Sequence, residues 1–139
     1  YPPSAYAVAL GIGYSDLQAR WRAWQRIRSL GYSAPPLVHP RAYVADSARV
    51  GEGVMVMAGA IVDVRVTLGD LVVVWPGACI SHDSSIDENT FISPNVTVCG
   101  SVKIGRDSFI GAASVIADHL ELPSSTRLKM QSRYTGKLA

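Results

Sequence analysis

Aliphatic residues recur at every sixth position from Val44 to Leu128, without a break in register. A period of six fits neither the 3.6-residue repeat of an α-helix nor the two-residue alternation of a hairpin meander. The segment therefore predicts a repeat architecture. All fifteen residues at these positions are valine, isoleucine or leucine: Val44, Val50, Val56, Val62, Leu68, Val74, Ile80, Ile86, Ile92, Val98, Ile104, Ile110, Ile116, Leu122 and Leu128.

Each hexad is interpreted as one short strand and one corner of a coil that has three flat sides. Three hexads close one turn of eighteen residues, and each aliphatic side chain points inward. The residue four positions later is mostly small or β-branched, as in Ala48, Val54 and Ala60, which suits a narrow corner. Stacked coils bury an aliphatic column and pair their strands in parallel, about 4.8 Å per coil. The expected coils span residues 44–61, 62–79, 80–97 and 98–115, with a partial fifth from residue 116.

The chain before the repeat carries a different pattern, which predicts a partial α/β, Rossmann-like segment. Residues 5–13, AYAVALGIG, are apolar enough for a buried strand that ends at Gly11 and Gly13. Ser15 can then cap a helix over residues 16–30. A strand, a glycine turn and a helix make half of a βαβ unit. The Gly-Ile-Gly turn is a weak nucleotide-binding signal, because the third glycine of the full motif is absent.

These patterns divide the chain into three parts. Residues 1–38 are expected to be a remnant of an N-terminal α/β domain, residues 39–130 the β-helix, and residues 131–139 a C-terminal tail. The first residue is Tyr1, and no basic segment followed by an apolar run marks a signal peptide. Further chain is therefore expected before Tyr1 in the gene product.

Composition and charge exclude several classes of protein. No apolar run approaches the roughly 18–20 residues of a membrane span. The net charge of +2 is small and the basic residues are scattered, which argues against a nucleic-acid partner but suits a phosphorylated small ligand. Cys79 and Cys99 are twenty residues apart and miss the eighteen-residue stacking distance by two. A disulfide is not predicted, and a reducing cytoplasm is the default location.

The third coil brings residues capable of acyl transfer to the surface. His82 lies two residues after the inward Ile80, so it should face outward, with Asp83 beside it. Gly100 follows His82 by eighteen residues and should therefore lie one coil away. A neutral imidazole can accept the proton of an attacking amine or hydroxyl, and a carboxylate can orient the ring. The backbone N–H of a glycine can stabilise the oxyanion without a Cβ in the path of a thioester.

The segment 82–105, HDSSIDENTFISPNVTVCGSVKIG, resembles the core motif of the sialic acid O-acetyltransferase-like family of hexapeptide-repeat acyltransferases, and the resemblance extends over residues 5–118. The family includes bacterial N-acetyltransferases of nucleotide-linked bacillosamine and perosamine precursors. The resemblance implies a left-handed β-helix, a homotrimer with active sites between neighbouring chains, and acetyl-coenzyme A as co-substrate. It implies that His82 is the catalytic base, that Asp83 is its partner, and that the amide of Gly100 contacts the acetyl carbonyl. It also implies that residues 1–38 belong to a nucleotide-sugar-binding domain.

The resemblance further implies where coenzyme A binds. Gly111, Ala112 and Ala113 form a run of small residues that is expected to lie next in line after Gly100 on the same side, where the pantetheine arm would pass. Lys129 belongs to a basic cluster suited to the phosphates of coenzyme A, although a solvated tail is an equally good interpretation. The other members of this cluster are Arg127, Arg133 and Lys137.

Two aromatic residues qualify this interpretation. Trp75 should point outward, either to a subunit contact or to a ligand ring. Phe91 stands where many family members have a histidine, so a polar contact of that histidine with the donor would be absent or replaced here.

The function expected from the sequence is acetyl transfer from acetyl-coenzyme A to an amino or hydroxyl group of a sugar, expected to be nucleotide-linked, for surface polysaccharide or glycan synthesis. Attack is direct, with no acyl-enzyme and no metal. One alternative is a non-catalytic scaffold or sugar-binding β-helix. A less favoured alternative is a γ-type carbonic anhydrase, which needs several converging histidines on zinc, whereas this chain has only His39, His82 and His119, widely spaced.

Overall fold

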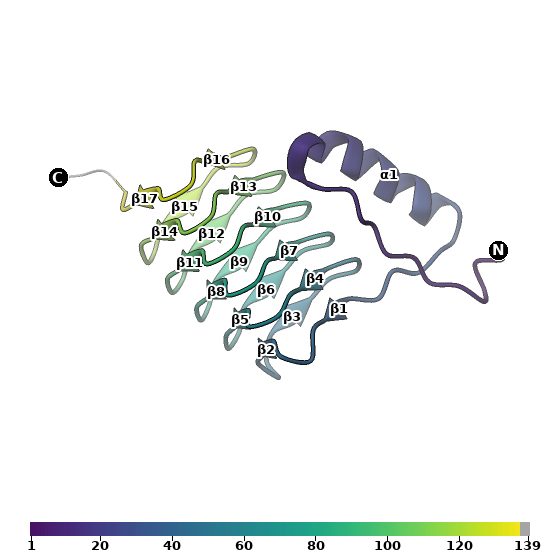
Figure 1. Cartoon of the computed structure of the whole chain (residues 1–139), viewed down its shortest axis with the longest axis horizontal. Helices are drawn as coiled ribbons and strands as arrows, with labels where there is room; N and C mark the ends of the chain where they lie inside the picture. Colours follow the sequence, from purple (N-terminus) through teal and green to yellow (C-terminus); the bar gives the residue numbers. More distant parts are fainter. Residues whose placement is uncertain (137–139) are drawn as a thin grey trace.

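The computed structural model describes residues 1–136, and these form a parallel β-helix with one α-helix beside it (Figure 1). The strands are two residues long, and strands three apart in sequence pair in parallel. Paired residues are eighteen positions apart, as Val44 and Val62 are, so each coil has the length that the hexad period predicts. Mainly β structure with parallel coils is therefore confirmed.

The strands form three ladders, which we call sheets 1, 2 and 3. Sheet 1 contains β1 (Leu37–Val38), β4 (Met55–Val56), β7 (Val73–Val74), β10 (Phe91–Ile92), β13 (Phe109–Ile110) and β16 (Arg127–Leu128). Sheet 2 contains β2 (Tyr43–Val44), β5 (Ile61–Val62), β8 (Cys79–Ile80), β11 (Thr97–Val98), β14 (Val115–Ile116) and β17 (Arg133–Tyr134). Sheet 3 contains β3 (Arg49–Val50), β6 (Thr67–Leu68), β9 (Ser85–Ile86), β12 (Lys103–Ile104) and β15 (Glu121–Leu122).

The turns between the sheets stack into three edges, which we name by the sheets they join. Edge 1/2 includes residues 75–78, 93–96, 111–114 and 129–132; edge 2/3 includes residues 63–66, 81–84, 99–102 and 117–120; edge 3/1 includes residues 69–72, 87–90 and 105–108. The last described strand, β17, lies within the segment 131–139 that was expected to be a tail. The first strand, β1, lies just before residue 39.

The core is the aliphatic column that the hexads predict. Ile80, Ile92 and Ile110 are fully buried in it, with valines and alanines from the edges filling the space between them. Some edge positions are buried serine or threonine whose hydroxyls bond to backbone groups. Ser84, for example, donates to the carbonyl of Cys99 at 3.0 Å and accepts from the N–H of Val102 at 3.1 Å. Small polar residues are therefore tolerated because each hydroxyl links two coils.

The buried strand predicted for residues 5–13 is not formed. Most of these side chains are exposed, and the segment makes a single bridge, between Ala7 and Ser33, with the N–H of Val8 bonded to the carbonyl of Ser33 at 2.9 Å. Among residues 1–136 this segment has no neighbouring strands that could extend a sheet. The Rossmann-like unit is thus not seen. Residues 5–13 instead form an extended strap that leads into a helix.

The predicted helix is present, with a different N-cap. A short 3₁₀ turn, η1 (Tyr14–Asp16), leads into α1 (Leu17–Ser29). Asp16, not Ser15, is the cap, and its Oδ1 accepts from the N–H of Ala19 at 2.8 Å. Helix α1 lies along edge 3/1 (Figure 1), where Trp24 is buried against Leu71.

Candidate active site

His82 and Asp83 lie together on edge 2/3, in the turn between β8 and β9. The Nδ1 of His82 is 2.8 Å from Oδ2 of Asp83, and both side chains face solvent, as predicted. Asp83 adopts a left-handed backbone conformation with φ of 59°, which places it at the tip of the turn. An ionised carboxylate can only accept a hydrogen bond, so in the neutral imidazole Nδ1 carries the proton and Nε2 is the free base.

Gly100 is stacked on His82 one coil further along the same edge. A Cβ added at Gly100 would lie 2.6 Å from Cε1 and 2.7 Å from Nε2 of His82. The imidazole therefore occupies the space that any other side chain at position 100 would need. The carbonyl of Gly100 accepts from the N–H of His119 at 3.0 Å, whereas the N–H of Gly100 donates none of the backbone hydrogen bonds of residues 1–136. This N–H is therefore free to donate to a ligand.

Arg65 joins this site, and sequence reasoning missed it. Its Nε donates to Oδ1 of Asp83 at 2.6 Å and its Nη2 to Oδ2 at 2.9 Å. Hydrogen bonds from Arg65, and then from His82, hold the pKa of Asp83 well below its usual range, and the same ion pair raises the pKa of Arg65. The sequence contains a signal for this contact. Arg65 precedes Asp83 by eighteen residues, so it occupies the same turn position in the preceding coil.

The residues predicted to bind coenzyme A share one edge, but it is not the edge of Gly100. Gly111, Ala112 and Ala113 lie on edge 1/2, eleven residues after Gly100, and eleven is not a multiple of eighteen. The prediction that they follow Gly100 on the same side is wrong, because sheet 2 separates the two edges. Lys129 stacks on Gly111 one coil later, where a Cβ at Gly111 would lie 2.6 Å from the carbonyl carbon of Lys129.

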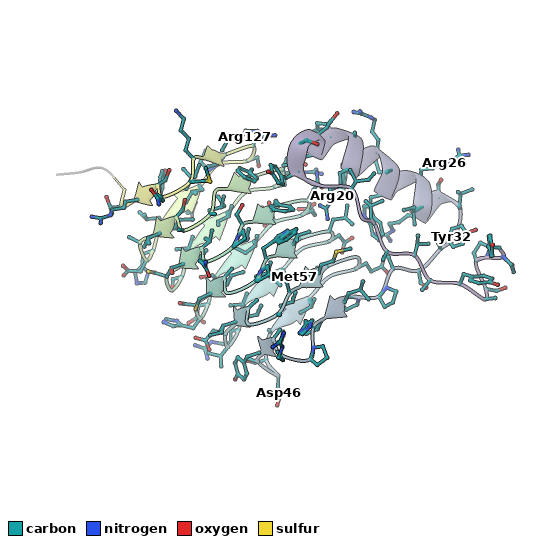
Figure 2. All side chains as sticks on the ribbon, viewed as in Figure 1. Arg20, Arg26, Tyr32, Asp46, Met57 and Arg127 are labelled. Atoms are coloured by element: carbon teal, nitrogen blue, oxygen red, sulfur yellow. The ribbon has the colours of Figure 1, made fainter. Side chains whose placement is uncertain are left out.

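The basic cluster around Lys129 is dispersed over two sheets and an edge. Lys129 is exposed on edge 1/2, Arg127 lies in β16 of sheet 1, and Arg133 lies in β17 of sheet 2. Lys137 is outside the described residues. Figure 2 shows Arg127 at the end of the coil stack opposite to Asp46, in the first coil.

An apolar cavity of about 190 Å³ lies on sheet 1 beside edge 1/2. Tyr14, Phe91 and Phe109 form its aromatic wall, with ring centroids 4.7 Å apart for Tyr14 and Phe109 and 4.9 Å apart for Tyr14 and Phe91. Phe91 is 4% exposed, so it is a packing residue of this apolar wall. The rest of the lining is Trp75, Ser93, Pro94, Ala112 and Met130.

Trp75 lies at the rim of this cavity and is 37% exposed. Its ring centroid is 5.7 Å from that of Phe91. It points outward, as predicted. Its exposed ring is free to meet either a subunit or a ligand.

Two further observations concern membranes and metals. The only α-helix among residues 1–136, α1, is too short and too polar to cross a bilayer. Over the same residues there is no group of three or more histidine, cysteine, aspartate or glutamate side chains that could hold a metal ion.

The fold and the site define a class: a parallel β-helix of hexapeptide repeats with a histidine–carboxylate pair at one edge. Comparison with known proteins agrees, because residues 83–118 match the family described as bacterial transferase hexapeptide (six repeats). These residues contain Asp83, Gly100 and the small residues of edge 1/2.

More particular similarity is to solved structures of acetyltransferases. The acetyltransferase domain of PglB from Neisseria gonorrhoeae has 28% identity and a TM-score of 0.94, over 99% of this chain and 66% of that one. The same domain in complex with acetyl coenzyme A has a TM-score of 0.89, with 28% identity over 95% of this chain and 65% of that one.

PerB from Caulobacter crescentus, in complex with CoA and GDP-perosamine, has 31% identity and a TM-score of 0.63, over 81% of this chain and 62% of that one. The chain thus spans about two thirds of the length of these structures. The resemblance to hexapeptide-repeat sugar acetyltransferases that the sequence indicated is confirmed.

Proposed function

We propose that this chain is the β-helical part of an acetyltransferase that moves the acetyl group of acetyl-coenzyme A to an amino group of a nucleotide-linked sugar. The observation that carries the proposal is the edge 2/3 site, where Nδ1 of His82 is 2.8 Å from Asp83 and Nε2 lies over Gly100. Structures that resemble this chain hold acetyl coenzyme A in one case, and CoA with GDP-perosamine in another. Transfer to a hydroxyl group uses the same base and is the second candidate acceptor.

In the reaction, Nε2 of His82 accepts the proton of the attacking amine while the nitrogen forms its bond to the thioester carbonyl carbon. The N–H of Gly100 donates to the oxyanion of the tetrahedral adduct. The C–S bond then breaks, and the imidazolium returns its proton to the departing thiolate. The products are the N-acetyl sugar and coenzyme A, with no covalent acyl-enzyme.

The donor groove is assigned to edge 1/2, where Ala112 and Ala113 present small side chains to the pantetheine arm and Lys129 would face the phosphates, while Gly111 is buried under the backbone of the next coil. Within one chain this groove and His82 lie on opposite edges of sheet 2. A homotrimer of left-handed coils, in which the base edge of one chain meets the donor edge of its neighbour, would complete the site. The separation of the two edges supports this assembly.

Calorimetric titration of the chain with acetyl-coenzyme A tests the donor site first. The proposal expects saturable binding at one site per chain, in a sample whose light scattering gives the mass of a trimer. Absence of binding by a trimeric sample would instead favour a non-catalytic scaffold.

Catalysis is tested by thiol release with GDP-perosamine and other nucleotide-linked amino sugars. His82→Ala is expected to lower kcat by roughly 10³-fold, because the general base is lost, and to leave the fold intact, since the side chain is outside the core. His119→Ala is the matched control, because His119 is an exposed histidine on the same edge. Wild-type turnover by His82→Ala would disprove the assignment.

A further inference from the structure

A chain of contacts along edge 2/3 links three coils to the base. Within it, Arg65 donates through its backbone N–H to the hydroxyl of Ser47 at 3.1 Å, and through its guanidinium to both oxygens of Asp83. Oδ2 of Asp83 also lies 2.8 Å from Nδ1 of His82. Ser47, Arg65 and Asp83 occupy the same turn position in consecutive coils, eighteen residues apart.

The contact between Arg65 and Asp83 is bidentate, so it fixes the orientation of the carboxylate as well as its distance from the guanidinium. Two parallel N–H···O bonds hold the plane of the carboxylate, as a single ammonium donor does not. Without them the side chain of Asp83 on an exposed turn has broad freedom about its terminal torsion. The oxygen that accepts from the imidazole is thus presented in one orientation.

The charges around Asp83 also favour its ionised form. The guanidinium of Arg65 is the first cause of the lowered pKa of Asp83, and His82 is the second. Asp63, two residues before Arg65 in the same turn, adds to the raised pKa of Arg65 and so helps to keep the guanidinium charged. A carboxylate that stays ionised accepts from Nδ1–H at every pH at which the imidazole is neutral.

We propose that Arg65 is a positioning residue, whose bidentate pair with Asp83 holds neutral His82 in the Nδ1–H tautomer with Nε2 as the base. The expected effect on kcat rests on the proposed function, whereas the expected effect on the tautomer of His82 does not. Arg65 would not touch either substrate and would act only through Asp83. Its role differs from that of an ordinary surface ion pair, which contributes little to stability.

The test compares Arg65→Gln and Arg65→Lys with Lys103→Gln. Lys103 is the matched control because it also pairs with a carboxylate eighteen residues away, Glu121, at 2.6 Å, and both side chains are exposed. The ¹⁵N shifts of the His82 ring, assigned by their loss in His82→Ala, report the tautomer at alkaline pH. Arg65→Gln is expected to convert the single Nδ1–H tautomer into a mixture, Arg65→Lys to convert it in part, and Lys103→Gln to leave it unchanged.

The kinetic arm measures thiol release by the same variants. Arg65→Gln is expected to lower kcat by roughly 10–100-fold, with KM for acetyl-coenzyme A within about twofold, because ring orientation and not donor binding is lost. Arg65→Lys should recover part of kcat. An unchanged tautomer, or an unchanged kcat in Arg65→Gln, would overturn the inference. Absence of turnover in the wild type would overturn the proposed function instead, and the tautomer measurement would still decide the role of Arg65.

Discussion

At the scale of single residues, the site depends on the absence of a side chain as much as on the presence of one. Position 100 carries no Cβ, and the imidazole of His82 lies in the space that a Cβ would fill. The ring thereby packs over Gly100 while the rest of the side chain faces solvent. Asp83 and Arg65 then fix its rotation, so that four residues on one edge define both the position of the base and its tautomer.

A methyl group at position 100 should therefore impair catalysis without unfolding the protein. Gly100→Ala is expected to push the imidazole aside and lower kcat by roughly 10–100-fold, because a displacement of about 1 Å costs that much at a reacting centre. The free energy of unfolding should change by less than about 1 kcal/mol, since the group that must move is an exposed side chain. Thiol-release kinetics and urea unfolding measure the two effects.

Ser101→Ala, at the neighbouring position of the same turn, is the control for this substitution. It should keep both the wild-type kcat and the wild-type stability. If Gly100→Ala retained full activity, the close fit between the ring and position 100 would have no functional meaning.

At the scale of elements, helix α1 is fastened to the coils by one buried cation. Arg20 is fully buried and donates through Nη1 to the carbonyl of Leu71 at 2.7 Å and to Oδ1 of Asn89 at 2.9 Å. Its Nε donates to the carbonyl of Ile12 at 3.1 Å, so the strap before the helix is held as well. Burial lowers the pKa of Arg20 to about 10, which leaves it charged at neutral pH.

Arg20→Ala should loosen this attachment. The carbonyl of Leu71 and the amide of Asn89 would lose their donor inside a packed interface, at an expected cost of about 2–4 kcal/mol in the free energy of unfolding. Urea unfolding measures the cost, and hydrogen exchange in α1 locates it. Arg26→Ala is the control, because Arg26 is exposed on the same helix and points away from the coils (Figure 2). Equal effects of the two variants would contradict the role of Arg20.

At the scale of the whole molecule, stability comes from stacking, because each coil buries its aliphatic residues only between its neighbours. Ile92, in the middle of the stack, pairs with Val74 on one side and Ile110 on the other. Among the described residues Leu128 pairs with Ile110 alone, and it is partly exposed at the end of its sheet. An aliphatic residue is therefore expected to contribute more to the free energy of unfolding at position 92 than at position 128.

Ile92→Ala should destabilise the protein by about 3 kcal/mol, since it leaves a cavity enclosed by coils on both sides. Leu128→Ala should cost about 1 kcal/mol, because the terminal coil can relax and its side chain is already partly solvated. Urea unfolding of the two variants at equal protein concentration gives the comparison. Equal losses would show that the end of the stack is covered, for example by another copy of the chain.

The period of six allowed most of the fold and part of the site to be predicted. It sets the length of a coil, so it places Gly100 on His82 and makes both face outward. The same arithmetic, applied to Arg65 and Asp83, would have found their pairing. It was misapplied to Gly111, which is offset from Gly100 by eleven residues and lies on another edge.

What the sequence by itself determined is the repeating part of this protein, because in a coil of constant length the spatial neighbour of a residue is set by counting along the chain. What only the tertiary structure decided is the part outside the repeat. Residues 5–13 have the composition of a buried strand, yet they lie exposed, because a strand needs partners that its own sequence does not specify. The placement of α1 along edge 3/1, and of Tyr14 against Phe91 and Phe109, likewise depends on contacts between segments far apart in sequence, whose geometry no local period encodes.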